Sequence, residues 1–114
     1  MASRSVAFDN SGALLTASSV AVYTVPTGYK ATVQKLLCMN TDGASAYTLT
    51  LHVALDGAAV ASANLAYIRT IGSNQTDLAP LVGLSGLPAG AKIYAKGDTT
   101  LKLRLLGSVT ETTV

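Results

Sequence analysis

The sequence predicts an all-β fold, namely an antiparallel β-sandwich of the jelly-roll or immunoglobulin-like kind with about eight strands. Apolar and polar residues alternate in several short segments, as in strands with one buried side. Clusters of Gly, Pro, Asn and Asp separate these segments, and helical periodicity is almost absent. With 114 residues, the chain has the length of about one domain.

Composition narrows the class of protein. Hydrophobic residues make up 49% of the chain and the net charge is only +2, which excludes a disordered chain. The longest uncharged stretches, such as 11–29, contain Ser, Thr, Pro and Gly, and they fall short of the ~20 apolar residues of a membrane span. Charged residues reach 12%, against roughly 25% in a typical soluble domain. We therefore expect much of the surface to be buried against other protein.

The basic residues and the single cysteine give two further expectations. The eight Lys and Arg residues are scattered along the chain, unlike the basic stripe of a nucleic-acid-binding protein. Cys38 is the only cysteine and forbids an intrachain disulfide, and the first four residues lack the apolar core of a secretory signal. We expect a protein made in the cytoplasm, with no nucleic-acid or membrane partner.

The first two predicted strands are joined by a turn. Residues 20–25 alternate weakly and stop at Pro26-Thr27-Gly28, where Pro presets the first turn position and Gly accepts a positive φ. The chain extends again over 29–38, and its alternation slips by one residue at Lys35, which a single-residue bulge explains. Residues 40–46 are the expected loop to the next strand.

The clearest strand is 47–55, which is expected to bury one face. That face consists of Tyr47, Leu49, Leu51, Val53 and Leu55. The following Asp56-Gly57 suits a two-residue primed turn. The resulting hairpin would place Val53 opposite Val60 and Leu55 opposite Ala58.

The region from 58 to 90 contains further strand and turn signals. Residues 65–71 should form a strand, Ser73-Asn74 a turn, and 76–84 another extended stretch. Pro80 in that stretch indicates a sheet edge. The turn Leu87-Pro88-Ala89-Gly90 should lead into the next strand.

The last predicted pair of strands covers 91–96 and 101–105, where apolar residues alternate with polar or charged ones. Facing residues of an antiparallel pair share a face, so we expect a hairpin with an odd-numbered loop, of three or five residues, centred on Asp98. In this register Ile93 faces Leu103, Ala95 faces Leu101 and Lys92 faces Arg104.

The two ends of the chain have no clear place in the sandwich. We expect residues 1–12 to form an N-terminal arm, 13–110 the β-sandwich domain and 111–114 a C-terminal tail.

No combination of residues indicates a catalytic, cofactor or metal site, so we predict that the protein is not an enzyme and uses no cofactor. His52, the only histidine, falls on the polar face of its strand, where a solvated or interface side chain is expected. Cys38 lies in an apolar stretch and should be a buried, inert thiol. Asp42, Asp56 and Asp98 suit Asx turns, with a weak calcium site between facing loops as the alternative.

Six residues are candidates for binding a protein partner. Four are cations predicted to group on one sheet face, where they either form a solvated surface or dock onto an acidic protein. The other two belong to the predicted N-terminal arm. The candidates are Arg4, Phe8, Lys92, Lys96, Lys102 and Arg104. A glycan-binding module is a further alternative, although the five tyrosines are dispersed and Trp is absent.

Two stretches resemble small structural proteins of tailed bacteriophages. Residues 23–33, YTVPTGYKATV, followed by NTDG at 40–43, are similar to the Y-x-V-P-x-G-x-x-A-x-V and N-x-x-G opening of those proteins. Residues 86–95, GLPAGAKIYA, are similar to their G-L-x-A-G-x-x-I-Y-A entry to a hairpin. The matches frame most of residues 20–107. The sequence departs from the family where A-G-D is common, because Ala91 follows Gly90, and this removes a cap or loop hydrogen bond.

The resemblance implies a non-enzymatic virion component. The favoured one is a head decoration, or cement, protein that stabilises the capsid through oligomeric contacts. The alternatives are a tail, neck or head-fibre accessory module and a glycan-binding host-recognition domain. Proteins of this family are generally β-sandwich oligomers, often trimers, with terminal arms that reach neighbouring subunits. The resemblance therefore implies a homo-oligomer, expected to be a trimer, located in the virion and bound to the major capsid protein or another virion protein.

Overall fold

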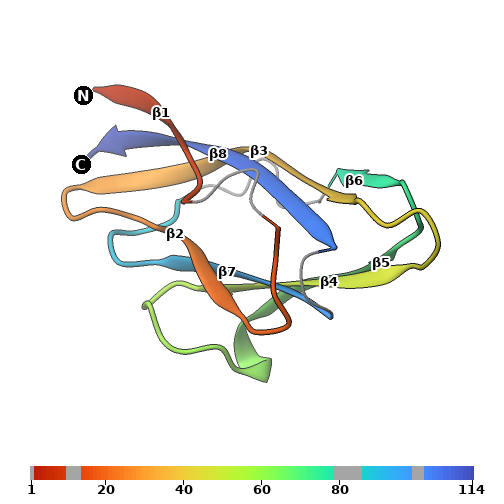
Figure 1. The fold of residues 1–114 in the computed structure, drawn as a ribbon. Helices are drawn as coiled ribbons and strands as arrows, with labels where there is room; N and C mark the ends of the chain where they lie inside the picture. The colour runs from red at the N-terminus through yellow and green to blue at the C-terminus, as the bar shows by residue number, and fades with distance from the viewer. Residues whose placement is uncertain (1, 10–13, 79–85, 99–101) are drawn as a thin grey trace.

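The computed structural model describes residues 2–9, 14–78, 86–98 and 102–114. These residues form two four-stranded antiparallel sheets that pack face to face (Figure 1). This architecture confirms the predicted β-sandwich. None of the described residues belongs to a helix that is long and apolar enough to cross a membrane.

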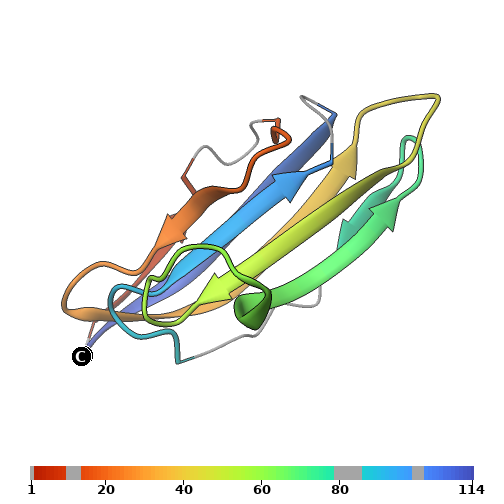
Figure 2. The same cartoon turned by 90° about the horizontal axis from the view of Figure 1, so that it is seen from below.

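The first sheet has the strand order β1-β8-β3-β6, and the second has the order β2-β7-β4-β5. The strands of the first sheet are β1 (Ser3–Ala7), β8 (Leu103–Thr113), β3 (Tyr29–Asn40) and β6 (Thr76–Leu78). Those of the second are β2 (Val20–Thr24), β7 (Lys92–Gly97), β4 (Tyr47–Ala54) and β5 (Leu65–Ile71), and a short 3-10 turn, η1 (Ser62–Asn64), precedes β5. Seen from below, the strands of the two sheets run in roughly aligned directions (Figure 2), as in other aligned sandwiches.

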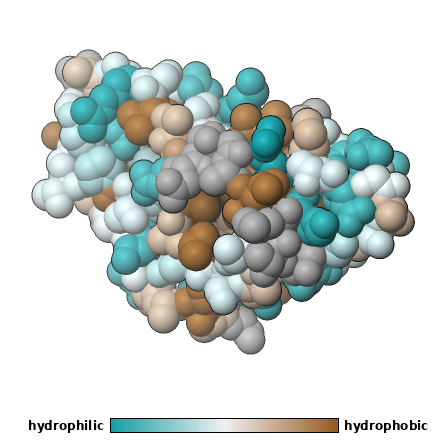
Figure 3. Space-filling model, viewed as in Figure 1, coloured by the Kyte–Doolittle hydropathy of each residue, from teal (hydrophilic) through white to brown (hydrophobic). Residues whose placement is uncertain are grey.

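The core lies between the sheets and consists of inward side chains from both. Leu49 and Leu51 of β4 and Ile93 of β7 are buried in one cluster with Val33 of β3 and Leu103 of β8. The inward positions predicted for Leu49, Leu51 and Ile93 are therefore confirmed. Ala54, expected on the opposite face of its strand from Leu49 and Leu51, is also buried. The side of the sandwich seen in Figure 1 is hydrophobic near its middle, while its two ends are mainly hydrophilic (Figure 3).

The local features predicted between β2 and β3 are confirmed. The Tyr29 N–H donates to the Pro26 carbonyl at 3.2 Å, and Gly28 has a φ of 87°, a conformation that favours glycine. The pairing of β3 with β8 shifts between Val33 and Lys35. Gln34 is thus the extra residue of the expected bulge.

The strand predicted for 65–71 and the turns predicted at Ser73-Asn74 and 87–90 are also confirmed. β5 has the predicted bounds. A hydrogen bond from the Gln75 N–H to the Gly72 carbonyl closes the first turn, and one from Ala91 to Pro88 closes the second. β6 lies at a sheet edge, as expected for its stretch, and the predicted continuation with Pro80 lies outside the described residues.

The partner predicted for β4 is wrong. β4 lies between β7 and β5, so Val53 is opposite Ile93 and not opposite Val60. Leu55, expected on the inner face, lies beyond the end of β4 and is 58% exposed.

The reason is the course of residues 55–61. The Gly57 N–H donates to the Ala54 carbonyl, so the chain does turn here, but it does not return as a strand. Its alanines have little side chain to pack into a core. The segment crosses the outer face of the second sheet instead (Figure 2), where the Ala58 carbonyl accepts the Tyr94 hydroxyl at 3.1 Å.

The predicted hairpin of the last two strands is wrong as well, because β7 and β8 lie in different sheets. Lys92 lies opposite Thr24 and Ala54, whereas Arg104 lies opposite Met39. Alternation shows which face of a strand is buried and does not show which strand lies beside it. β7 and β8 bury the residues predicted to be inward, but they do so from opposite sheets across the core and not as neighbours in one sheet. Leu101 and most of the loop around Asp98 lie outside the described residues.

The ends of the chain have a place in the sandwich, contrary to the expectation of an arm and a tail. β1 pairs with the end of β8, with Ser3 opposite Thr112 and Ala7 opposite Ser108. Phe8 then enters the core and is 3% exposed. A short strand of this kind depends on contacts with the far end of the sequence, so its local pattern is weak. Residues 10–12 of the predicted arm lie outside the described residues.

Glycine at position 107 leaves room for Phe8 in the core. A Cβ atom there would lie 2.6 Å from two ring atoms of Phe8 and 3.1 Å from the Lys35 carbonyl oxygen. We expect Gly107→Ala to displace the ring and lower the free energy of unfolding by about 1–3 kcal/mol, the usual cost of overpacking, as measured by urea denaturation. Gly43→Ala is the matched control, because the nearest atom to its added Cβ lies 3.5 Å away. In a Phe8→Ala background Gly107→Ala should cost much less, and an equal cost would contradict the role given to the ring.

Candidate functional site

The six predicted partner-binding residues lie in three separate parts of the sandwich. Arg4 and Phe8 lie on and just after β1. Lys92 and Lys96 lie on β7 of the second sheet, whereas Lys102 directly precedes β8 of the first sheet and Arg104 lies on it. The structure therefore does not bring the four cations together on one sheet face.

Arg4 and Phe8 make contacts inside the chain. The Arg4 Nε atom donates to Oε1 of Glu111 at 2.7 Å, and its guanidinium carbon lies 4.4 Å from the centre of the Tyr29 ring. The Phe8 ring stacks on Tyr23, with ring centres 5.8 Å apart. Phe8 is buried within this chain, so its prediction as a partner-binding residue is wrong. The Arg4 side chain remains 53% exposed.

Glu111 links β1, β2 and β8. Its side chain is 2% exposed, and a buried carboxylate requires charged or hydrogen-bonding partners. Arg4 supplies one, and the Tyr23 hydroxyl donates to Oε2 at 2.5 Å. Burial, followed by the bond to Glu111, raises the pKa of Tyr23 above its usual value. The buried carboxylate thus holds both sheets together and has a structural role.

Of the four cations, Lys102 has a partner within the chain. Its Nζ atom lies 3.7 Å from Oδ2 of Asp42. Arg104 is exposed, and Lys92 and Lys96 are half-buried on β7. Separated in this way, the four side chains do not form the single basic patch expected for docking onto an acidic surface.

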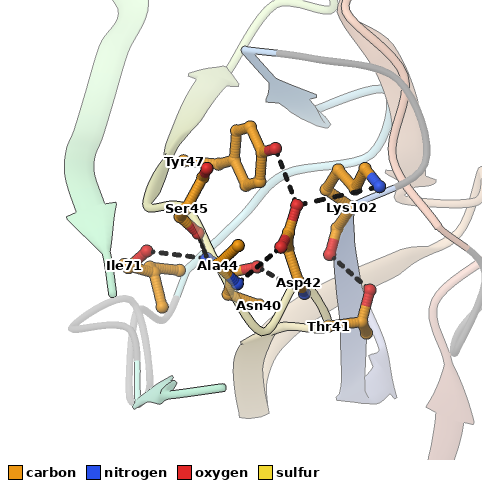
Figure 4. Close-up of polar contacts among 8 residues, drawn as sticks. All are labelled: Asn40, Thr41, Asp42, Ala44, Ser45, Tyr47, Ile71 and Lys102. Carbon is orange, nitrogen blue, oxygen red and sulfur yellow. Dashed lines mark hydrogen bonds and ion pairs between the residues drawn. The ribbon is translucent and has the colours of Figure 1, made fainter. Parts of the chain in front are cut away.

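Asp42 and Asn40 organise the loop between β3 and β4, which connects the two sheets (Figure 4). The Asn40 amide is buried and donates to the Ser45 and Ile71 carbonyls at 2.9 and 3.0 Å. Oδ1 of Asp42 accepts the Ala44 N–H at 2.7 Å, and Oδ2 accepts a hydrogen bond from Tyr47, as Figure 4 shows. The predicted Asx turn at Asp42 is confirmed.

A second Asx turn is confirmed at Asp56, whose Oδ1 accepts the Ala58 N–H at 3.0 Å. For Asp98 this role stays a prediction. The weak calcium site is not supported, because no group of three or more His, Cys, Asp or Glu side chains among the described residues could hold a metal ion.

His52 and Cys38 lie apart from one another in the sandwich. His52 is half-buried on β4, opposite Tyr94 and Leu65, and within the described part of the chain its buried Nδ1 atom has no hydrogen-bond partner. Cys38 is fully buried, and this burial, with a smaller effect of Asp77, raises the pKa of its thiol to about 12. The thiol is therefore protonated and unreactive at neutral pH.

The tyrosines make contacts within the chain and do not form an exposed row. Four hydroxyls donate to groups of the protein itself, and the ring of Tyr29 lies under Arg4. The four pairs are Tyr23 with Glu111, Tyr47 with Asp42, Tyr67 with Asp77 and Tyr94 with the Ala58 carbonyl. These contacts leave fewer hydroxyls for a glycan.

The most distinctive exposed surface is apolar and was not predicted. Seven large hydrophobic residues are exposed among the described residues, and four of them lie on β5 or in the connection before it. We call these four the β5 surface; they are Leu55, Val60, Leu65 and Ile68. The same connection borders a hollow of about 470 Å³ lined mostly by alanines. The sequence signal was the apolar run in 65–71, which predicted a strand without showing which residues would be exposed.

Comparisons with known proteins add little to this geometry. No protein-family model matches the chain, and no curated protein matches it. A chain from a solved structure of Bacillus endospore appendages, described as a novel family of disulfide-linked pili, is similar over 99% of this chain and 88% of its own length. Its sequence identity is 8% and the TM-score is 0.49. A likeness of this extent does not establish a shared function.

The Tyr23 hydroxyl should contribute to stability through Glu111. We expect Tyr23→Phe to lower the free energy of unfolding by about 1–3 kcal/mol, because it leaves a buried carboxylate oxygen without its donor. Tyr94→Phe, which removes a hydroxyl from an exposed bond to the Ala58 carbonyl, is the matched control and should cost less. Urea denaturation of both variants gives the comparison, and equal costs would contradict the role of Glu111.

The Asp42 turn should make stability depend on pH. The Ala44 N–H, followed by Tyr47 and Lys102, lowers the pKa of Asp42 in the folded chain. Ionised Asp42 therefore stabilises the fold above the ordinary aspartate pKa of about 4, and this contribution is lost as the pH falls further. Between pH 6 and pH 3, thermal unfolding of Asp42→Asn should shift less than that of the unmodified chain. Asp9→Asn, which removes an exposed carboxylate, is the control, and an Asp42→Asn profile parallel to that of the unmodified chain would refute the assignment.

Proposed function

We propose that this chain is a non-enzymatic structural protein of a tailed bacteriophage particle, specifically a head decoration protein that binds the major capsid protein as a homo-oligomer. The resemblance of residues 23–33, 40–43 and 86–95 to small phage structural proteins supports the phage assignment. Its place of action would be the virion, after synthesis in the host cytoplasm.

The observation that carries the proposal is how the polar and apolar side chains are distributed. Asn40 and Asp42 of the NTDG motif bind backbone groups of their own loop. Tyr23, from the other motif, binds a buried carboxylate. These three polar side chains thus bind groups within the chain, while apolar side chains of the β5 surface remain exposed. Exposed apolar side chains on one strand and the connection before it offer a contact to other chains.

The free energy gained by burying a small apolar interface favours a contact that is repeated by symmetry over a single contact. Each square ångström of apolar surface removed from water contributes roughly 25 cal/mol, and ordering the partners offsets much of this gain. A small interface therefore becomes effective when symmetry repeats it. A protein that coats a capsid lattice meets this condition.

The location can be tested with an antibody raised against the purified chain. Immunogold electron microscopy of phage particles from cells that express the gene should show label distributed over the head, and particles that lack the protein should lose their DNA at a lower temperature. Label confined to tails, necks or fibres would replace the decoration role with an accessory one. Particles without label, together with binding of the purified chain to a glycan array, would favour host recognition and refute the proposal.

A further inference from the structure

The exposed edge of the second sheet is formed by β5. Of the four edge strands in the described residues, β5 is the longest with seven residues, compared with five in β1 and β2 and three in β6. Its sequence LAYIRTI contains neither Pro nor Lys, the residues that commonly protect an edge from pairing.

Side chains on this edge are exposed and largely apolar. Leu65 is 48% exposed and Ile68 is 60% exposed. Arg69 is the only charged residue of the strand, and its Nε atom lies 3.5 Å from Oδ1 of Asp77. A long, exposed and largely apolar edge strand is a pairing site for another strand.

We propose that β5 pairs antiparallel with β5 of a second copy of this chain, about a two-fold axis at Ile68. The two four-stranded sheets then become one eight-stranded sheet. This inference rests on the homo-oligomer in the proposed function and names the surface that would form it.

Charge complementarity favours a second copy as the partner and disfavours the register with the axis at Arg69. With the axis at Ile68, the two Ile68 side chains meet, and Arg69 of each copy lies opposite Tyr67 of the other. Tyr67 donates its hydroxyl to Asp77, so each guanidinium approaches an aromatic ring and a carboxylate. An axis at Arg69 would instead place two like charges opposite each other, which is unfavourable.

The strand is therefore its own complement. Tyr67 and Arg69 lie one residue on either side of Ile68, so a two-fold rotation exchanges a cation with an aromatic partner. The pairing of β5 with β4 shifts at Ala66, which lies outside this central triplet. A two-fold contact joins the same surface of both copies and closes at two, in contrast to the trimer expected from the resemblance.

Mass measurement provides the first test. Light scattering after gel filtration should give a particle of twice 11.6 kDa. Ile68→Lys should raise the dissociation constant roughly tenfold or more, because burial of one apolar side chain in each copy is lost and two ammonium groups meet. Val20→Lys is the matched control, since Val20 is 43% exposed on β2 at the opposite edge of the same sheet, and it should leave the mass unchanged.

Cysteine cross-linking tests the register. Opposite residues in an antiparallel pair have Cα atoms about 4.5–5.5 Å apart, which is within the reach of a disulfide. Ile68→Cys should therefore form an intermolecular disulfide under mild oxidation. The two copies of residue 70 would lie four residues apart along the strands, or about 13 Å, so Thr70→Cys should not cross-link. The unmodified chain is the control for cross-linking through Cys38. Because Cys38 is buried, this chain should form no intermolecular disulfide.

Each of the other outcomes would overturn the pairing. These are a monomer, a trimer, a dimer that persists in Ile68→Lys, or equal cross-linking by Ile68→Cys and Thr70→Cys. A monomer that still labels phage heads would refute β5 pairing and leave the proposed function standing. A dimer that cross-links at residue 68 but labels no particle would support β5 pairing and refute the proposed function.

Discussion

A buried carboxylate is the constraint on which the arrangement of the chain ends depends. Glu111 lies on β8 between the sheets, where an ionised group without partners is strongly destabilising. Its two oxygens are satisfied by Arg4 from β1 and Tyr23 from β2. The same carboxylate therefore fixes the N-terminal strand in the first sheet and connects that sheet to an edge of the second. Phe8 follows directly and stacks on Tyr23, so the polar and apolar contacts support each other.

A comparable arrangement holds the opposite end of the sandwich. The buried Asn40 amide binds carbonyls of the β3–β4 loop and of Ile71 at the end of β5. Asp42 then receives the Tyr47 hydroxyl and lies near Lys102. Both ends are thus closed by polar side chains whose hydrogen-bonding capacity is used within the chain. The sheet edge between them is free to present apolar groups.

The proposed assembly function rests on exposed apolar residues and not on the histidine or the cysteine. The histidine has a buried ring nitrogen without a partner in the described residues, and the only cysteine is a protonated core residue. Among the residues that the structure describes, neither belongs to a group of His, Cys, Asp or Glu side chains that could hold a metal ion. The exposed Leu65 and Ile68, by contrast, lie on a strand edge whose backbone can pair directly with another chain.

The sequence by itself determined the local features: the alternation of buried and exposed faces, the Pro26 turn, the bulge at Gln34 and the bounds of β5. These depend on neighbouring residues and on the conformations that Pro and Gly allow. The tertiary structure decided which strands lie side by side. It placed Arg4 on a paired strand and Phe8 in the core, in contrast to the free arm expected. Arg4 and Glu111 are 107 positions apart, and Tyr23 and Glu111 are 88 apart. Alternation along a strand carries no information about such distant partners, because any strand with a buried face satisfies the same pattern.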